Sequence, residues 1–354
     1  MKAMEPLLKI LLYLIILIIV GIIVLFIYSL ITEYRPDKTE ILFKAENNTT
    51  ISYNEDIDIL TWNIGYSGLG SDMDFFYDGG KRMRTGRERF LENLKNITQF
   101  ISAHSYFDII LLQEIDIKSK RSFHTNIYDS IKRTIPNATH IFATNYKAKH
   151  VPIPITNPMG KVHSGLSTIS HAVPAIAKRY SYPGNYKWPG SLFNLKRCFL
   201  LSRYNLPDEK ELIIINTHNS AYDDGSLRKL QMDYLKQIML SEYEKGNYVI
   251  AGGDWNQLPP DFKQQFLFNV FDTIQVQNIS VDYLPGWKWV YDAEIPTNRR
   301  LESPYDAAST LTTLIDYFLV SPNVDIIEIK GMHLDFIYSD HNPVIAKFRL
   351  NNNY

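Results

Sequence analysis

The chain has 354 residues, of which 45% are hydrophobic and 13% aromatic, and it carries a formal net charge of -1. This composition supports a large folded core and excludes wholesale disorder. Because the chain has no excess of basic residues, an extensive surface that binds long nucleic acid is not expected. A local basic patch is still compatible with this composition. The single cysteine, Cys198, cannot form an internal disulfide, and we interpret it as a small core residue.

An uncharged apolar run of 22 residues, 10–31, follows a short N-terminal tail, residues 1–9. As an α-helix it would be about 33 Å long, which matches the hydrocarbon core of a bilayer. It is longer than the apolar region of a secretory signal and lacks a small-residue cleavage site, so we expect an uncleaved transmembrane anchor, with a cleaved signal as the alternative. Flanking positive charges slightly favour a cytoplasmic N-terminus, which predicts a single-pass membrane protein with its large domain outside the cytoplasm.

The segment after the apolar run, residues 32–56, is polar and irregular, and we expect a stalk with one edge strand at 41–43. Residues 57–354 then form the predicted large folded domain, in which apolar and β-branched runs alternate with helical periodicity. Several strand pairs are joined too tightly for helical crossovers, so the pattern predicts an α/β fold with mixed sheets. The predicted strands are 57–62, 107–112, 165–169, 198–202, 212–216, 247–251, 314–320 and 344–350, and the predicted helices are 87–104, 125–135 and 227–243.

Five polar clusters follow predicted strands. Side chains at strand ends converge on one edge of a sheet, where α/β proteins place their chemistry. The clusters are Asn63 with Gly65, Gln113 with Glu114, His218 with Asn219, Asp254 with Asn256, and Asp316 with Asp340 and His341.

In this order the clusters resemble the endonuclease/exonuclease/phosphatase superfamily, which includes DNase I-like nucleases, apurinic endonucleases, inositol-polyphosphate phosphatases and neutral sphingomyelinases. Each cluster alone is a weak signal, whereas five in the family's order are specific. The resemblance covers residues 57–350, and the chain is similar to membrane-anchored bacterial members of the group. It implies a four-layer α/β sandwich, in which two mixed β-sheets pack face to face with helices outside.

The resemblance implies a divalent metal, Mg²⁺ with Mn²⁺ as a possible substitute. Glu114 offers the hard oxygen ligand that Mg²⁺ prefers. Asn63 is expected to ligate weakly or to hydrogen-bond the metal's waters, and Asp340 falls where the family has an acid close to the metal.

The resemblance also implies the catalytic roles. Asp254 is similar to the family's water-orienting aspartate, and Asn256 to the amide that holds a phosphoryl oxygen. His341 resembles the imidazole that approaches the scissile phosphate, and Asp316 the carboxylate that orients it. His218 corresponds to a second histidine that assists the leaving group or binds phosphate.

Five residues are weaker candidates for substrate contact: Lys81, Arg197, Asn219, Arg299 and Arg300. Lys81 belongs to a Gly-bearing loop with several cations, which could equally hold an anionic headgroup or form a solvated region before a helix. Two aromatic segments, 180–190 and 284–291, are compatible with base stacking, with a membrane interface or with covering the core.

These observations favour a Mg²⁺-dependent phosphodiester hydrolase at a membrane surface. The expected substrate is a phospholipid headgroup, as in sphingomyelinases, or a small phosphodiester. A membrane-tethered nuclease acting on nucleic acid is the alternative, and an inactive binding scaffold is the least favoured because every catalytic residue is present. The expected partners are the substrate and the bilayer around the N-terminal helix, and we infer no protein partner.

Overall fold

Two β-sheets pack face to face in the computed structural model, which describes residues 4–352 apart from 222, 224 and 264–276. The first sheet has six strands in the order β14 (Val324–Gly331), β15 (Val344–Leu350), β2 (Ile57–Asn63), β3 (Ile109–Asp116), β5 (Gly160–Ser170) and β4 (Thr139–Val151). The second has seven, β1 (Thr39–Lys44), β6 (Ile176–Ser181), β7 (Cys198–Asn205), β8 (Glu211–His218), β9 (Tyr248–Asp254), β13 (Asp316–Val320) and β10 (Lys288–Val290). Both are mixed, because β2 pairs with β3 and β8 with β9 in parallel.

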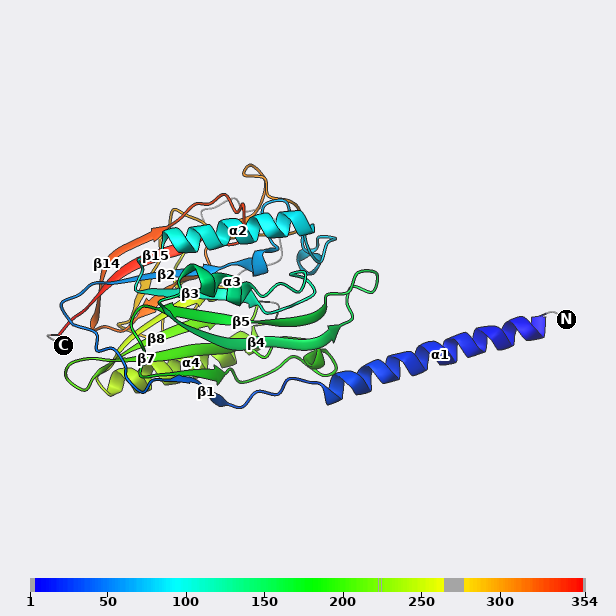
Figure 1. Cartoon of the computed structure of the whole chain (residues 1–354), viewed down its shortest axis with the longest axis horizontal. Helices are drawn as coiled ribbons and strands as arrows, with labels where there is room; N and C mark the ends of the chain where they lie inside the picture. The colour runs from blue at the N-terminus through cyan, green and yellow to red at the C-terminus, as the bar shows by residue number, and fades with distance from the viewer. Residues whose placement is uncertain (1–3, 222, 224, 264–276, 353–354) are drawn as a thin grey trace.

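Helices cover the outer faces of the two sheets and complete four layers (Figure 1). Helices α2 (Arg87–Ala103) and α3 (Ile127–Thr134) lie on the six-stranded sheet, and α4 (Ser226–Glu244) lies on the seven-stranded sheet. A two-stranded ribbon, β11 (Asn298–Arg299) with β12 (Thr312–Thr313), and three short 3₁₀ helices, η1 (Gly65–Ser67), η2 (Phe76–Asp78) and η3 (Gly190–Leu192), complete the described elements. The predicted four-layer α/β sandwich is therefore confirmed.

The central strands are buried on both faces, which explains their nearly continuous apolar sequences. On β2, Ile57 and Ile59 belong to the core between the sheets, whereas Leu60 and Trp62 belong to the core under α2. The strand's twofold periodicity therefore divides its side chains between two cores. The only cysteine, Cys198, is fully buried in a smaller apolar cluster between the sheets.

The N-terminal helix α1 (Met4–Ile31) extends away from the sandwich (Figure 1). Residues 6–31 are long and apolar enough to cross a membrane, and none of the most apolar stretch is buried against the domain. Residues 32–56 were expected to form a stalk with one edge strand at 41–43. The structure has a strand there, because β1 lies at the edge of the seven-stranded sheet and pairs antiparallel with β6. Farther along the segment, Thr50 bridges Asn205.

Three long or central strands were not predicted from the sequence: β4, β6 and β14. β4 and β14 form the two edges of the six-stranded sheet, where one side of the strand has no neighbour. Charged side chains are common on edge strands because they protect the open edge from further pairing. The resulting mixture of polar and apolar residues hides the strand signal in the sequence.

Candidate active site

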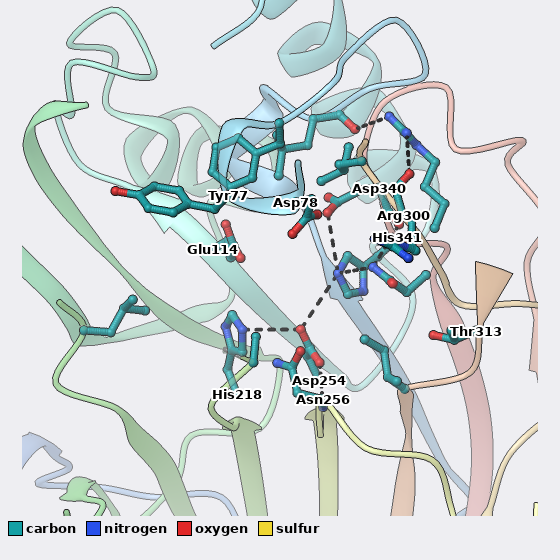
Figure 2. Close-up of a pocket in the computed structure, with 18 of the residues that line it drawn as sticks. Tyr77, Asp78, Glu114, His218, Asp254, Asn256, Arg300, Thr313, Asp340 and His341 are labelled. Atoms are coloured by element: carbon teal, nitrogen blue, oxygen red, sulfur yellow. Dashed lines mark hydrogen bonds and ion pairs between the residues drawn. The ribbon is translucent and has the colours of Figure 1, made fainter. Parts of the chain in front are cut away.

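The predicted polar clusters meet at one pocket of about 1440 Å³, at the carboxyl ends of β2, β3, β8 and β9 (Figure 2). Both parallel pairs point their carboxyl ends toward the same end of the sandwich, which is why segments far apart in the chain contribute. The predicted site residues that line the pocket are Glu114, Arg197, His218, Asp254, Asn256, Arg299, Arg300, Asp340 and His341. Asn63 and Asp316 lie directly behind them, in contact with Asp254 and His341.

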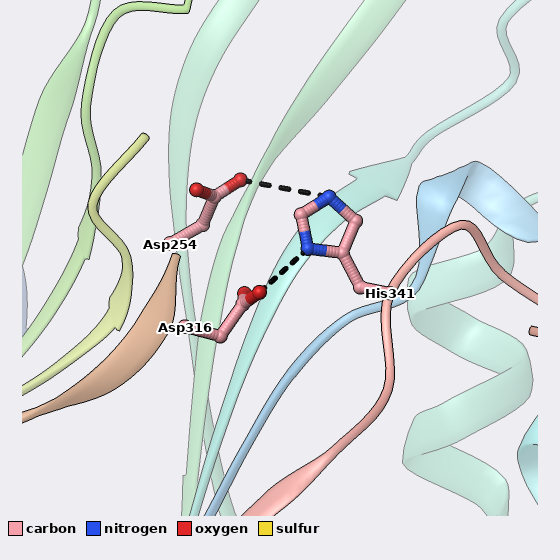
Figure 3. Close-up of side chains that lie close together, drawn as sticks. All are labelled: Asp254, Asp316 and His341. Atoms are coloured by element: carbon pink, nitrogen blue, oxygen red, sulfur yellow. Dashed lines mark hydrogen bonds and ion pairs between the residues drawn. The ribbon is translucent and has the colours of Figure 1, made fainter. Parts of the chain in front are cut away.

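The centre of the site is a buried Asp–His–Asp group, Asp316, His341 and Asp254 (Figure 3). His341 Nδ1 donates to Asp316 Oδ2 at 2.8 Å, and His341 Nε2 lies 3.8 Å from Asp254 Oδ2. Trp62 Nε1 donates to the backbone carbonyl of His341 at 2.9 Å, which fixes the loop that carries the histidine. The imidazole is therefore held by one carboxylate while its other nitrogen faces the pocket.

Asp254 also receives polar contacts from two predicted residues on other strands. Asn63 Nδ2 donates to Asp254 Oδ2 at 3.0 Å, and His218 Nε2 lies 3.3 Å from the same oxygen (Figure 2). Gly253 permits this arrangement, since it has φ +141 and a Cβ there would lie 2.1 Å from the carbonyl oxygen of Thr217. β9 thus approaches β8 closely enough to bring His218 and Asp254 together.

Burial and the surrounding charges move the pKa values of these groups. Burial and the nearby Asp316 carboxylate raise the pKa of Asp254 to about 7. Burial lowers the pKa of His341, but the carboxylates of Asp316, Asp340 and Asp254 outweigh it and raise the value to about 10. Burial and the positive charges of Arg197 and His341 hold the pKa of His218 well below its usual range. His341 is therefore cationic and His218 neutral near neutral pH.

Two further carboxylates, Glu114 and Asp340, face the same pocket and are suited to a divalent cation. A β-bulge between Leu112 and Ile115 turns Glu114 into the pocket with φ 56. Burial and the charge of Glu114 raise the pKa of Asp340 to about 7 despite the opposing effect of His341. A divalent cation bound by these carboxylates would relieve this repulsion, so the residues present fit a metal that prefers oxygen ligands.

A glycine allows Asp340 to reach its position. Gly65 has φ +48, and a Cβ at this residue would lie 2.6 Å from Asp340 Oδ1. Asn63 Oδ1 accepts from the backbone N–H of Gly65 at 3.0 Å, and Ser339 Oγ donates to the carbonyl of Asn63 at 2.8 Å. The first and last predicted clusters are thus packed directly against each other.

Arg121 is a pocket residue that the sequence did not indicate. Its guanidinium is buried, donates to both oxygens of Asp116 at 3.0 Å, and lies 3.8 Å from Glu114 Oε2. It also stacks 3.7 Å from the centre of the Tyr66 ring. Arg121 lies in a turn and not at the end of a recognisable strand, so its contact with Glu114 depends on the tertiary fold.

Asn298 was also missed, although the next two residues, Arg299 and Arg300, were candidates for substrate contact. Its side-chain nitrogen lies 3.0 Å from His341 Nε2, and its backbone bridges that of His341. The amide of an asparagine can donate through nitrogen or accept through oxygen after a flip, so Asn298 can bond the imidazole in either protonation state. No strand signal marked this residue, because β11 has only two residues.

The five weaker candidates differ in whether their side chains line the pocket. Arg197 is 9% exposed, lines the pocket, and its Nε has no hydrogen-bond partner among the described residues, so this cation is available to an anion. Arg300 lines the pocket and lies 3.4 Å from Glu302. Arg299 also borders the pocket, but it donates to the backbone carbonyls of Gly70 and Met73 at 2.7 and 3.1 Å. These bonds hold the neighbouring loop together.

Lys81 and Asn219 do not line the described pocket. Lys81 is exposed on the loop after η2, where its backbone N–H donates to Asp74 at 2.7 Å. Asn219 is fully buried, and its side chain contacts Thr217 and Tyr182. Its backbone carbonyl instead accepts from Asn256 Nδ2 at 2.9 Å, which orients Asn256 at the pocket wall.

The site lies at one edge of the two stacked sheets. It combines the His341 imidazole, held between carboxylates, with a nearby amide and with the acids Glu114 and Asp340. This combination is typical of hydrolases that act on phosphoester bonds. The chain belongs to the Endonuclease/Exonuclease/phosphatase family, whose model matches residues 60–341. No curated protein matched the chain in a sequence comparison.

Solved structures show the same fold at low sequence identity. An endonuclease/exonuclease/phosphatase from Beutenbergia cavernae has a TM-score of 0.54 and 18% identity, covering 84% of this chain and 72% of its own. ANGEL2, a 2′,3′-cyclic phosphatase solved with adenosine-2′,3′-vanadate, has a TM-score of 0.54 and 15% identity, covering 84% and 96%. D. rerio TDP2, solved with a single-strand DNA product, has a TM-score of 0.51 and 13% identity, covering 84% and 100%.

Proposed function

We propose that this protein is a divalent-metal-dependent phosphodiester hydrolase that acts at a membrane surface, with a phospholipid headgroup or another small phosphodiester as substrate. The observation that carries the proposal is the single pocket at which Asp254, His341, His218, Glu114 and Asp340 meet. The membrane part rests on α1, which is long and apolar enough to span a bilayer. We propose a single-pass arrangement with the domain outside the cytoplasm.

A phosphodiester in the pocket would have its phosphorus in front of Asp254 and His341, which face the pocket side by side. Asp254 is placed to orient the attacking water and accept its proton, since its raised pKa makes it a better base than an exposed aspartate. His341, charged and held by Asp316, donates from Nε2 to a phosphoryl oxygen. His218 is neutral, so it contributes a hydrogen bond rather than a charge to the substrate.

Glu114 and Asp340 would hold the metal, with Asn63 oriented beside them. When bound, Mg²⁺ neutralises charge that develops on the phosphoryl and leaving oxygens. Mn²⁺ is expected to substitute, because carboxylates bind both ions. Arg121 keeps the carboxylate of Glu114 in place through its charge and its contact with Asp116.

The charge of the pocket favours a small or lipid-borne diester over long nucleic acid. The described residues that line it include five arginines and six carboxylates. This part of the wall therefore has no continuous row of cations that could bind the backbone of a nucleic acid. The arginines are Arg121, Arg197, Arg228, Arg299 and Arg300, and the acids are Asp78, Glu114, Asp223, Asp254, Glu302 and Asp340.

A membrane-tethered nuclease is the second candidate. The observation in its favour is the likeness of the fold to TDP2, whose solved structure holds a single-strand DNA product. The pocket is also larger than the roughly 300–1,000 Å³ that suits a small ligand, which leaves room for a nucleotide chain.

Purified full-length protein should be incubated with sphingomyelin, bis-p-nitrophenyl phosphate and supercoiled plasmid, each with Mg²⁺, with Mn²⁺ and with EDTA. We expect metal-dependent hydrolysis of the first two and little nicking of plasmid, and His341→Ala should abolish the activity. Plasmid nicking as the dominant reaction would instead establish the nuclease. No metal-dependent reaction with any substrate would reject the hydrolase.

Metal binding can be measured separately from activity. Mg²⁺ should raise the unfolding temperature of the wild type, because a ligand that binds only the folded state stabilises it by about 2.7 kcal/mol at 100 times its dissociation constant. Glu114→Gln should lose this shift. Glu328→Gln, which changes an exposed acid on β14, should keep it.

A further inference from the structure

Helix α1 packs against a loop that also borders the catalytic pocket. The Phe26 ring of α1 lies 6.3 Å from the Trp188 ring and 6.2 Å from the Phe193 ring, measured between centroids. Just after the helix, Glu33 pairs with Lys196 at 2.8 Å. The segment 186–197 therefore connects the end of the apolar helix to the pocket wall, which includes Tyr186 and Arg197.

The chain after α1 is fixed to the domain within a few residues. The Tyr34 ring lies under the amino group of Lys147 at 5.5 Å and near the guanidinium of Arg179 at 5.9 Å. β1 then begins at Thr39 and pairs with β6. Because no long free linker separates α1 from the sandwich, a bilayer around α1 would lie directly against this end of the domain.

Apolar side chains are exposed at the same end. Ile153 and Ile155, in the loop between β4 and β5, are 48% and 91% exposed, and Trp188 is 68% exposed. Phe76 and Tyr77 of η2 are 36% and 40% exposed. The β4–β5 loop projects from the end of the domain at which α1 leaves it (Figure 1). We refer to these five residues as the apolar rim.

The apolar rim lies on segments that border the pocket. Each of its three segments supplies a pocket-lining residue, namely Tyr77, Met159 and Tyr186. Tyr77 stands at the edge of the pocket in Figure 2. The segments are also joined to one another, since Arg84 donates to the carbonyl of Pro158 at 3.2 Å and Tyr146 donates to that of Phe193 at 2.7 Å.

The depth of the contact suits a headgroup region. The apolar span of 26 residues exceeds the roughly 20 needed to cross a bilayer. Phe26 lies five residues, or about 8 Å along the axis, before the C-terminal end of α1. Trp188, which contacts Phe26, is therefore level with the part of the span nearest the domain. Tryptophan is favoured at this interfacial level. Exposed lysines at positions 147, 149, 161 and 187 flank the rim and complement anionic headgroups.

We propose that the apolar rim rests on the bilayer that holds α1, so that the pocket takes phosphodiester headgroups from the adjacent leaflet. This inference rests on the proposed function for the reaction, but the contact itself is independent of it. The rim excludes water from the route between bilayer and pocket. A lipid headgroup therefore reaches Asp254 and His341 without leaving the membrane surface.

The contact is tested with full-length protein in nanodiscs of phosphatidylcholine, phosphatidylglycerol and sphingomyelin. Ile155→Cys and, as a matched control, Ile327→Cys on β14 are labelled with an environment-sensitive fluorophore. The native thiol of Cys198 is fully buried and should not react. Lipids carrying nitroxides should quench the label at position 155 strongly and the label at position 327 weakly.

The functional consequence is tested with the double variant Ile155→Ser/Trp188→Ser. Neither Ile155 nor Trp188 lines the pocket. Loss of two apolar contacts with the bilayer should reduce sphingomyelin hydrolysis in nanodiscs by about tenfold or more. Hydrolysis of bis-p-nitrophenyl phosphate should stay within about twofold of wild type, since the chemistry is untouched. Ile327→Ser should change neither rate.

Equal or absent quenching at positions 155 and 327 would overturn the proposal, whatever the enzyme hydrolyses. Unchanged lipid hydrolysis in the double variant would overturn the route from bilayer to pocket. If position 155 is quenched but no diester is hydrolysed by the wild type, the membrane contact is supported and the proposed function fails.

Discussion

Asp254 of β9 and Asp316 of β13 are direct partners in the antiparallel register, so two carboxylates occupy neighbouring positions of one sheet. Like charges this close oppose each other's ionisation, and His341 is the cation that both of them face. The arrangement gives the two acids different tasks. Asp316 holds the imidazole at 2.8 Å, whereas Asp254 is placed toward the pocket with its pKa raised to about 7.

Asp316→Asn should reduce the turnover of a soluble phosphodiester by about 100-fold or more. The amide no longer carries the charge that keeps His341 protonated and oriented. Steady-state kinetics over a range of pH measure the effect, and the loss should grow as pH rises because His341 then deprotonates more easily. Asp335→Asn, at a side chain that is 66% exposed, serves as the control. A rate within twofold of wild type would contradict the positioning role of Asp316.

Arg121→Met should lower the free energy of unfolding by about 3–5 kcal/mol, because it leaves a buried carboxylate without its partner. That carboxylate is Asp116, whose side chain is 0% exposed. Arg349→Met removes a solvent-exposed pair with Asp56 and should have a much smaller effect, because solvent screens such a pair. Denaturant unfolding of both variants gives the comparison. Adding Asp116→Asn to Arg121→Met should recover part of the loss, and an additive further loss would argue against the pairing.

Gly65→Ala should impair both folding and metal binding. The new Cβ would lie 2.6 Å from Asp340 Oδ1, and the residue has φ +48, which costs a non-glycine residue about 1–2 kcal/mol. The displaced carboxylate should also weaken the Mg²⁺-induced rise in unfolding temperature. Gly86→Ala is the matched control, since a Cβ added at Gly86 would meet nothing within 4 Å and its φ is -67. Equal effects of the two substitutions would refute this role for Gly65.

The stability should depend on two partly buried histidines outside the pocket, His140 and His163. Burial lowers the pKa of each below the usual value of 6.5. Above pH 6.5 both histidines are neutral in the folded and in the unfolded chain. The free energy of unfolding then has its full value as far as these two groups are concerned. As pH falls below 6.5, the unfolded chain binds protons first and the free energy of unfolding decreases.

Denaturant unfolding between about pH 8 and pH 5 measures this effect as a difference between wild type and His140→Gln/His163→Gln. The comparison removes the contribution of the active-site groups, which both proteins share. The double variant should lose less stability than the wild type as pH falls. Parallel curves would show that the two histidines do not carry the dependence.

The sequence was sufficient to locate Glu114, His218 and Asp254, because they stand at or near the carboxyl ends of apolar strands. His341, by contrast, lies in the loop between β14 and β15, so it does not follow a strand. The strand-end pattern places a polar side chain at a sheet edge before any tertiary contact is known. It could not separate Arg197 from Lys81, since both are cations near predicted elements. The fold directs Arg197 into the pocket wall and leaves Lys81 exposed.

By itself the sequence determined the class of fold, the apolar N-terminal helix and the order of the polar clusters, all of which depend on local periodicity and spacing. Only the tertiary structure decided that Arg121 lies beside Glu114, that Asn298 lies beside His341, and that Trp188 packs on Phe26. These contacts join segments far apart in the chain. Their geometry is set by how two twisted sheets stack, and no local run of residues encodes it.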